Sequence, residues 1–546
     1  MDIHTVKKLE TTAVESTQSE FLRMGIALAF MLAVLWYSFG ADNVTNNAFL
    51  AIAAVFGAYM ALNIGANDVA NNVGPAVGSK ALTMGGAIVI AMIFEAGGAL
   101  IAGGDVVSTI KKGIIDPAMF INSQEFIWAM TAALLAGGIW LNLATSVGAP
   151  VSTTHSIVGG VMGGGIAAAG FSIVSWGTMG KIAASWVISP VLGAIIAALF
   201  LYSLKKSIIY KEDRLSAMRK MVPLYVALMA FAFATYLTLK GLKKIWPSII
   251  ETANAITPFT FEMAKKPTLL IALSIGLVSA VIVFLIVRPL VVKASLSLQN
   301  TVRDANSLFT IPLIFAAALL SFAHGANDVA NAVGPLAAIA DAVQSSAIAT
   351  KASIPLWVML IGAIGISLGL ALYGPKLIRT VGSEITELNQ IRAYSVAMAA
   401  AITVIIASQL GLPVSSTHIA IGGIFGVGFL REFLSTTSEQ EKIEEEEAQL
   451  NEDKKLKKTY KSELAELKAL EEKTEKDKAR ITMLKVLIEE EDEKIKIEKR
   501  HLKRAKKAKY VKRSAIMKII AAWVITVPAA ALLAAIAFNV IKSIMN

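Results

Sequence analysis

The segment GANDVANNVGP, Gly65 to Pro75, returns as GANDVANAVGP, Gly325 to Pro335, with a single substitution. Each of these GAND segments places an aspartate and at least two asparagines inside strongly apolar sequence. An ionisable residue is costly inside a membrane, so its presence there indicates function. The alternative, a glycine- and asparagine-rich turn that ends a helix, requires neither the aspartate nor the repetition. We therefore expect the two segments to form a functional site.

The composition is that of a polytopic membrane protein. Hydrophobic residues make up 55% of the 546 residues, charged residues 17%, and the mean hydropathy is +0.63. Apolar segments such as 21–40, 84–102 and 269–287 reach the length of about 20 residues that a membrane-spanning helix needs. The first twenty residues are polar and mixed in charge, unlike a signal peptide. We predict an all-α, multi-pass protein of the cell (inner) membrane with about 10–12 transmembrane segments.

The formal net charge of +11 raises nucleic-acid binding as an alternative. The basic residues, however, gather in connections between apolar segments, at 205–220, 288–303 and 501–513. That distribution is typical of loops that face the cytoplasm, so we expect no nucleic-acid partner and a lipid bilayer instead. Because the chain contains no cysteine, disulfides, thiolate metal sites and cysteine nucleophiles are excluded.

A second pair of motifs indicates that the chain is an internal duplication. The PVS segments, PVSTTHSIVGG from Pro150 and PVSSTHIAIGG from Pro413, follow their GAND segments at nearly the same distance. WVISP at Trp186 likewise has a counterpart, WVITVP, at Trp523. The predicted segments are an N-terminal tail and first transmembrane helix at 1–46, repeat 1 at 47–204, a basic loop with two linking helices at 205–308, the first part of repeat 2 at 309–434, a charged insertion at 435–513 and a closing transmembrane helix at 514–546.

The charge of the loops also predicts how the halves are oriented. If 205–220 and 288–303 both face the cytoplasm, the two GAND segments enter the membrane from opposite sides. Such inverted-topology repeats, with broken helices and re-entrant half-helices around a midplane site, are typical of secondary transporters.

The insertion at 435–513 is rich in Glu, Lys and Leu and contains neither Gly nor Pro. This composition favours a coiled-coil-like antiparallel helical hairpin with arms of about 50 Å. The alternative is a solvated, partly disordered linker. Its basic end places the insertion in the cytoplasm, where a regulatory protein is one partner to consider. The residues expected to form an apolar seam are Leu464, Leu467, Leu484, Leu487 and Ile495.

The PVS segments have the chemistry of an oxyanion site. Pro150 and Pro413 suit the first turn of a new helix, where the missing N–H costs nothing. Free backbone N–H groups, the positive helix end and hydroxyl side chains would then converge. The hydroxyls expected to contact the anion are those of Ser152, Thr153, Thr154, Ser415, Ser416 and Thr417.

The GAND segments have the opposite chemistry, that of a cation site. They contain no Lys or Arg, and an oxyanion beside two carboxylates would be repelled unless cations or protons entered with it. The inventory therefore predicts cation-coupled anion symport, with Na⁺ or H⁺ as the coupling ion and no other cofactor. The oxygen ligands expected to hold Na⁺ are those of Asn67, Asp68, Asn71, Asn327, Asp328 and Asn331.

Several other polar residues lie in apolar sequence. Glu95 has no counterpart in the second half, and we expect it to take part in coupling rather than only to pair with a neighbouring helix. His324 stands where the first copy has Ile64, which indicates a packing or supporting role. Lys111 and Lys112 are interpreted as interfacial loop residues.

His155 and His418 close the two PVS segments. A histidine there could bind the anion, accept the coupling proton or orient a hydroxyl. The alternative is a buried ring that hydrogen-bonds the backbone of the half-helix. The sequence leaves these readings open.

In these four motifs the chain resembles the inorganic phosphate transporter (PiT) family, and FEAGG and STIKKGIID in the first half extend the resemblance. The resemblance implies phosphate uptake driven by Na⁺ or H⁺, with ion ligands at Asn67, Asp68, Asn327 and Asp328. It also implies phosphate contacts from the PVS hydroxyls and a transport-linked glutamate at Glu95. The family's second such glutamate, before the second PVS segment, is absent, since this region reads RAYSVAMAA.

A second copy of the chain, in a homodimer, is a further partner to consider. Three other functions are alternatives to phosphate symport. A carrier for sulfate or another tetrahedral oxyanion would use the same donors. An anion channel would need a continuous pore, which midplane half-helices do not favour. An intramembrane hydrolase built from Ser152, His155 and Asp68 would need its nucleophile and base only once, whereas the motifs occur twice.

Overall fold

The computed structural model describes residues 3–40, 48–243, 245–345, 354–383, 388–469, 475–507 and 513–545. These residues form two compact units, one of Met1–Val427 with Arg513–Asn546 and the other of Gly428–Lys512. All named elements in the described residues are helical, and 12 helical segments are long and apolar enough to cross a membrane. The predicted all-α class and number of spans are confirmed.

The first half of the chain contains α1 (Ile3–Gly40), α2 (Ala48–Asn67), α3 (Ala70–Gly78), α4 (Met84–Ala102), α5 (Gly104–Lys112), η1 (Pro117–Met119), α6 (Ser123–Ser146), α7 (Thr153–Ala169), η2 (Phe171–Ile173) and α8 (Trp176–Leu204). The connection between the halves contains η3 (Lys205–Ile209), α9 (Arg214–Tyr236), η4 (Leu237–Gly241), α10 (Trp246–Ile256), α11 (Leu269–Ser295) and α12 (Val302–Ser307). The second half contains α13 (Thr310–Ser345), α14 (Leu356–Ser383), α15 (Gln390–Gln409), α16 (Ser416–Ala469), α17 (Glu475–Lys507) and α18 (Arg513–Met545).

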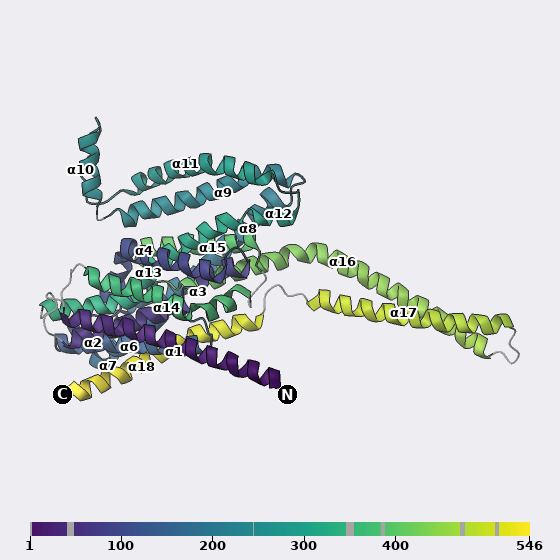
Figure 1. Cartoon of the computed structure of the whole chain (residues 1–546), viewed down its shortest axis with the longest axis horizontal. Coiled ribbons are helices and arrows are strands. Elements are labelled where there is room, and N and C mark those ends of the chain that lie inside the picture. The colour runs from purple at the N-terminus through teal and green to yellow at the C-terminus, as the bar shows by residue number, and fades with distance from the viewer. Residues whose placement is uncertain are drawn as a thin grey trace. The chain divides into compact units, whose positions relative to one another are not determined.

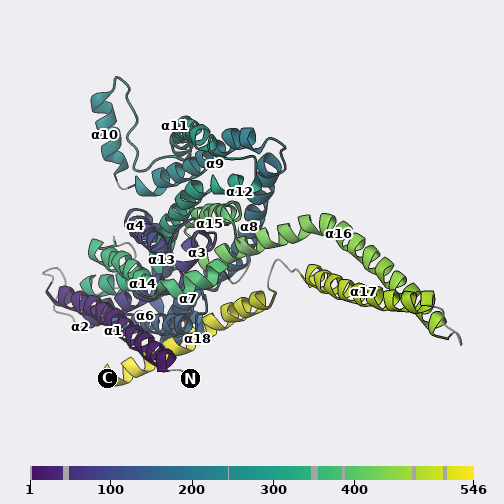
Figure 2. The ribbon, with the colours of Figure 1, turned by 45° about the vertical axis from the view of Figure 1, so that its right-hand side comes forward.

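Glycine allows the central helices to approach one another closely. A Cβ on Gly65 of α2 would lie 1.8 Å from the Ile366 carbonyl of α14, and a Cβ on Gly369 of α14 would lie 1.8 Å from the Leu62 carbonyl of α2. Membrane helices associate through such small-residue contacts because lipid supplies no hydrophobic driving force between them. Helices α9 and α11 form a separate pair that runs side by side (Figure 1; Figure 2).

The duplication in sequence is visible as a pair of equivalent contacts between the halves. Gly163 of α7 packs against the Ala531 carbonyl of α18, with 2.1 Å between a built Cβ and that oxygen. Gly426 of α16 packs in the same way against the Ala194 carbonyl of α8, again at 2.1 Å. Each PVS helix therefore packs on the closing helix of the other half.

The two GAND segments differ in backbone. In the first copy, α2 ends at Asn67 and α3 begins at Ala70, so Asp68 lies in a break. In the second copy, α13 continues through the segment, and the expectation of a broken helix is wrong there. Beside this break the Asn71 side-chain amide and the Asn71 backbone N–H both donate to the Asp68 carbonyl, at 2.9 and 3.0 Å.

The unit Gly428–Lys512 is an antiparallel helical hairpin, and the alternative of a disordered linker is wrong for its described residues. Arg480 on α17 donates to both carboxylate oxygens of Glu463 on α16 (2.7 and 3.1 Å), which lowers the pKa of Glu463. Lys494 pairs with Asp453 at 3.0 Å. The expected seam is present, with Leu484 and Ile495 buried and Leu464, Leu467 and Leu487 half-buried.

Candidate functional site

Each PVS segment starts a helix, as predicted. Ser152 is the N-cap of α7, and its hydroxyl accepts from the backbone N–H of His155 at 3.1 Å. The Ser415 hydroxyl accepts from the N–H of His418 at 3.2 Å, directly before α16 begins at Ser416. The expectation that the prolines lie in the first turn is wrong, because serine caps these helices two residues after each proline.

The two helix starts meet in the middle of the first unit. Thr154 Oγ1 donates to the Val414 carbonyl at 2.9 Å, which ties the start of α7 to the segment before α16. The rings of His155 and His418 lie 4.5 Å apart between centroids. All six predicted hydroxyl residues are buried, and the hydroxyls of Ser152 and Ser415 cap their own helices.

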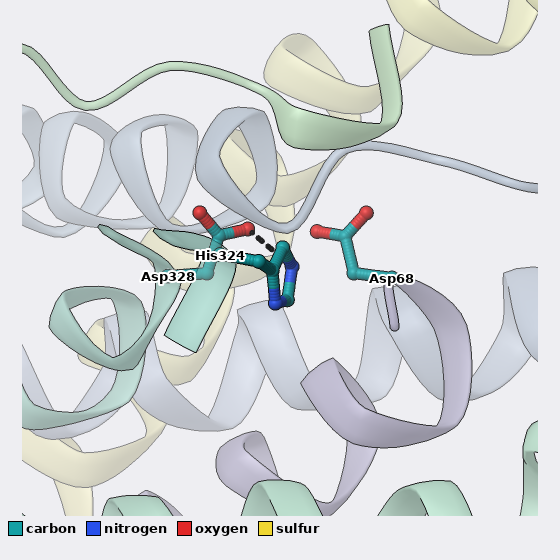
Figure 3. Close-up of side chains that lie close together, drawn as sticks. All are labelled: Asp68, His324 and Asp328. Atoms are coloured by element: carbon teal, nitrogen blue, oxygen red, sulfur yellow. Dashed lines mark ion pairs between the residues drawn. The ribbon is translucent and has the colours of Figure 1, made fainter. Parts of the chain in front are cut away.

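The two aspartates lie at this same place. Asp68 and Asp328, with His324, each offer one ligand atom, and these atoms lie within 4.8 Å of one another (Figure 3). Thr153 Oγ1 lies 2.6 Å from Asp68 Oδ2 and 3.3 Å from Asp328 Oδ2. Ser416 Oγ donates to Asp328 Oδ2 at 3.2 Å. The four motifs therefore converge on one fully buried cluster.

Two asparagines donate hydrogen bonds from one half to the other, and in the described part of the chain their own side-chain oxygens accept none. Asn71 Nδ2 donates to Thr417 Oγ1 at 2.8 Å, and Asn331 Nδ2 donates to Thr153 and Thr154 Oγ1 at 3.0 and 3.2 Å. Among the described residues, the Oδ1 atoms of Asn71, Asn331 and Asp328 have no hydrogen-bond donor. Buried oxygens without donors are the groups that a small hard cation can satisfy.

Asn67 and Asn327, the asparagines that precede the two aspartates, fasten the segments before the PVS helices. Asn67 Nδ2 donates to Thr145 Oγ1 (2.9 Å), and Asn67 Oδ1 accepts from the Val151 N–H (3.1 Å). Asn327 Nδ2 donates to Ser408 Oγ at 2.9 Å. Their expected role as cation ligands stays a prediction, and the structure adds a positioning role.

His324 lies between two buried carboxylates, so of its two expected roles the supporting one fits the structure and the packing one does not. Its Nδ1 is 2.7 Å from Glu95 Oε2, and its Nε2 is 3.1 Å from Asp328 Oδ2. Asn72 Nδ2 donates to the other Glu95 oxygen at 2.7 Å. The sequence contained one usable signal, since His324 and Asp328 are four residues apart and share one face of a helix. Glu95 thus joins the cluster through a histidine from the other half.

The rings of His155 and His418 pack on indoles. His155 lies 3.8 Å from Trp186, and His418 stacks at 3.6 Å on Trp523, measured between ring centroids. His155 Nδ1 and both ring nitrogens of His418 have no hydrogen-bond partner among the described residues. The alternative in which the His418 ring bonds the half-helix backbone is therefore not observed. Ser152 meets the backbone rather than the ring of His155, so no nucleophile–base pair forms.

Lys111 is not an interfacial loop residue as expected. It lies near the end of α5, is 5% exposed and pairs with Asp341 of α13. A buried lysine is stable only when such a partner neutralises it. The side chain of Lys112 lies outside the described residues.

Comparisons with known proteins show the family to which the chain belongs. A family model described as "Phosphate transporter family" matches residues 64–534. The chain is 48% identical over 552 residues to a "Putative phosphate permease" of Helicobacter pylori strain J99, covering 98% of each chain. It is 39% identical over 382 residues to a "Putative phosphate permease" of Thermococcus kodakarensis, covering 70% of this chain and 89% of that one.

A solved structure titled "The sodium-dependent phosphate transporter" is similar over 91% of this chain and 100% of that chain, with 30% identity and a TM-score of 0.70. The matched region contains all four motifs that build the buried cluster. The chain therefore belongs to the phosphate transporter family.

Proposed function

We propose that this chain imports inorganic phosphate together with Na⁺ by alternating access. The observation that carries the proposal is the convergence of two carboxylates with two hydroxyl-lined helix starts in one buried cluster. The similar structure named a sodium-dependent phosphate transporter supports both the substrate and the ion.

Electrostatics requires the coupling. Asp68 and Asp328 are fully buried, with ligand atoms within 4.8 Å of one another. Two unit charges at about 4 Å repel by about 4 kcal/mol at an effective dielectric constant of about 20, and an arriving phosphate would add to this repulsion. Na⁺ bound by Asp68, Asp328, Asn71 and Asn331 would neutralise the cluster before phosphate contacts the PVS donors.

Phosphate recognition is assigned to the two helix starts. The Thr153 and Ser416 hydroxyls contact the carboxylates, and those of Thr154 and Thr417 accept from Asn331 and Asn71. The starts of α7 and α16 meet beside them, and free N–H groups at a helix start favour an anion. Neutral donors suit an anion that shares its cavity with cations, because a fixed Lys or Arg would compete for the carboxylates.

The arrangement in the membrane is proposed from repeated contacts and loop charge. The equivalent packing of α7 on α18 and of α16 on α8 supports two related halves, and the basic loops support opposite insertion. The site would then lie near the midplane, with the hairpin 435–513 in the cytoplasm of an inner-membrane protein.

Proton coupling is a second candidate, favoured by the Glu95–His324–Asp328 chain of contacts. A histidine between two carboxylates could carry the coupling charge in place of one Na⁺.

Radiolabelled phosphate uptake into proteoliposomes, with Na⁺ and pH gradients imposed separately, tests both proposals. Stimulation by an inward Na⁺ gradient alone supports the first proposal, and stimulation by a pH gradient alone supports the second. Uptake that ignores both gradients would remove coupled transport altogether. Competition by sulfate identifies the anion, because a phosphate carrier should be little affected by it.

A further inference from the structure

A basic cavity lies away from the buried cluster, at the connection between α8 and α9. Its volume is about 700 Å³, and Lys206, Lys211 and Lys220 line it. Glu212 and Asp213 also line it, but the Asp213 carboxylate caps α9 by accepting from the Ser216 N–H at 2.9 Å. Between residues 205 and 220 the chain carries six basic and two acidic side chains. The cavity is therefore suited to an anion.

The cavity lies at the ends of two candidate membrane spans. It lies where the candidate spans Trp176–Ile209 and Arg214–Gly241 end and begin. Helix α8 passes there into the π-helical turn η3, and the Ser203 hydroxyl bonds the Tyr225 hydroxyl of α9 at 2.6 Å. This contact ties the two helix ends together, so the cavity has fixed walls.

The apolar side of the cavity continues into a lipid-exposed stripe on α8. Val191, Ile195 and Leu199 are 54%, 53% and 61% exposed, and they lead at helical spacing to Tyr202, which lines the cavity. A ligand with a charged head and apolar chains matches this surface. Inorganic phosphate, only a few times larger than a water of about 30 Å³, would fill little of the cavity.

We propose that this cavity binds the headgroup of an anionic phospholipid, with Lys206, Lys211 and Lys220 on the phosphate and the acyl chains along the α8 stripe. Basic pockets between helices at the cytoplasmic face bind lipid headgroups by this combination.

Binding of short-chain phosphatidylglycerol to the purified full chain, measured by calorimetric titration, tests the proposal. The variant with Lys206, Lys211 and Lys220 all replaced by Gln should bind about one hundredfold more weakly, at about fivefold per lysine. Ala217→Trp places an indole in the cavity without changing charge and should also weaken binding. The matched control replaces three exposed lysines elsewhere, Lys181, Lys265 and Lys266, with Gln, and should change the affinity less than about twofold.

Melting temperatures close to that of the unmodified chain would establish that each variant is folded. The proposal is overturned if both cavity variants bind phosphatidylglycerol normally, or if the control loses as much affinity as the lysine variant. Equal binding of zwitterionic phosphatidylcholine would also overturn it, because the lysines would then not select charge. Displacement of the lipid by millimolar inorganic phosphate would show a free-anion site instead.

Discussion

Replacement of Asp328 by asparagine removes one charge from the buried cluster and leaves the shape of the side chain nearly unchanged. The side chain accepts from Ser416 and Thr153 and lies 3.1 Å from His324, while its Oδ1 has no donor. Asparagine has nearly the same volume and keeps one carbonyl oxygen. We therefore expect a folded protein that has lost one negative charge where Na⁺ is proposed to bind.

The size of the effect follows from the geometry. A carboxylate and a cation about 4 Å apart attract by about 4 kcal/mol at an effective dielectric constant of about 20, equivalent to about a thousandfold in affinity. Asp68 and the new amide oxygen still coordinate the ion, so this value is an upper bound. We expect the Na⁺ concentration for half-maximal phosphate uptake to rise by at least about tenfold.

The assay is initial phosphate uptake into proteoliposomes over a Na⁺ series, with Glu125→Gln as the matched control. Glu125 is a buried carboxylate of α6 that pairs with Lys542 at 2.8 Å and has no contact with the cluster among the described residues. Asp328→Asn should shift the Na⁺ dependence, whereas Glu125→Gln should not. A folded Asp328→Asn protein with unchanged Na⁺ dependence would refute the charge argument.

Three further outcomes are expected. His324→Gln removes the ring between two buried carboxylates, so it should lower stability by about 3–5 kcal/mol and abolish uptake; normal melting with normal uptake would contradict the contacts. Gly163→Ala inserts a Cβ 2.1 Å from the Ala531 carbonyl and should cost about 1–3 kcal/mol in thermal or denaturant unfolding, whereas Gly177→Ala, which meets nothing within 4 Å, should not. Deletion of 436–512 with a short linker should leave phosphate uptake measurable, and its complete loss in a correctly inserted protein would show that the hairpin is part of the mechanism.

The sequence predicts most about the residues whose type is unusual in apolar sequence and which also occur in both halves. Carboxylates retained twice in apolar sequence, and hydroxyls retained twice before a helix, have few structural explanations, and the structure brings them together. The expectation of a transporter rather than a hydrolase is confirmed by the family. Inversion of the halves stays a prediction, because it rests on loop charge.

The sequence predicts only a packing or supporting role for His324, because the equivalent residue of the first half is Ile64. Comparison with Ile64 shows only that the two halves differ at this position. The residue that gives His324 its role is Glu95, which lies on another helix. The unbroken helix α13 could likewise not be predicted from the duplication, because the two GAND segments are nearly identical in sequence. Asn71 and its counterpart Asn331 both donate to PVS hydroxyls of the other half, and Asn71 donates in addition to the Asp68 carbonyl. The sequence does not show which acceptors an amide will meet.

The relatives also bear on the hairpin. The match to the Helicobacter pylori protein covers 98% of this chain, so it includes the hairpin, whereas the Thermococcus match covers 70%. The hairpin's ion pairs and apolar seam lie within its own two helices.

The asymmetry between the halves has a consequence for coupling. Asp68 is contacted by the Thr153 hydroxyl and faces no histidine from its own half, since the equivalent position is Ile64. Asp328 has His324 at 3.1 Å, and that ring also lies 2.7 Å from Glu95. A charged ring would neutralise Asp328 more than Asp68, because it lies 3.1 Å from Asp328 Oδ2 and only within 4.8 Å of the Asp68 carboxylate, so a shared Na⁺ should depend more on the charge of Asp68. The two aspartates, although they come from nearly identical segments, should therefore differ in Na⁺ dependence when each is replaced by asparagine, with the larger shift for Asp68→Asn.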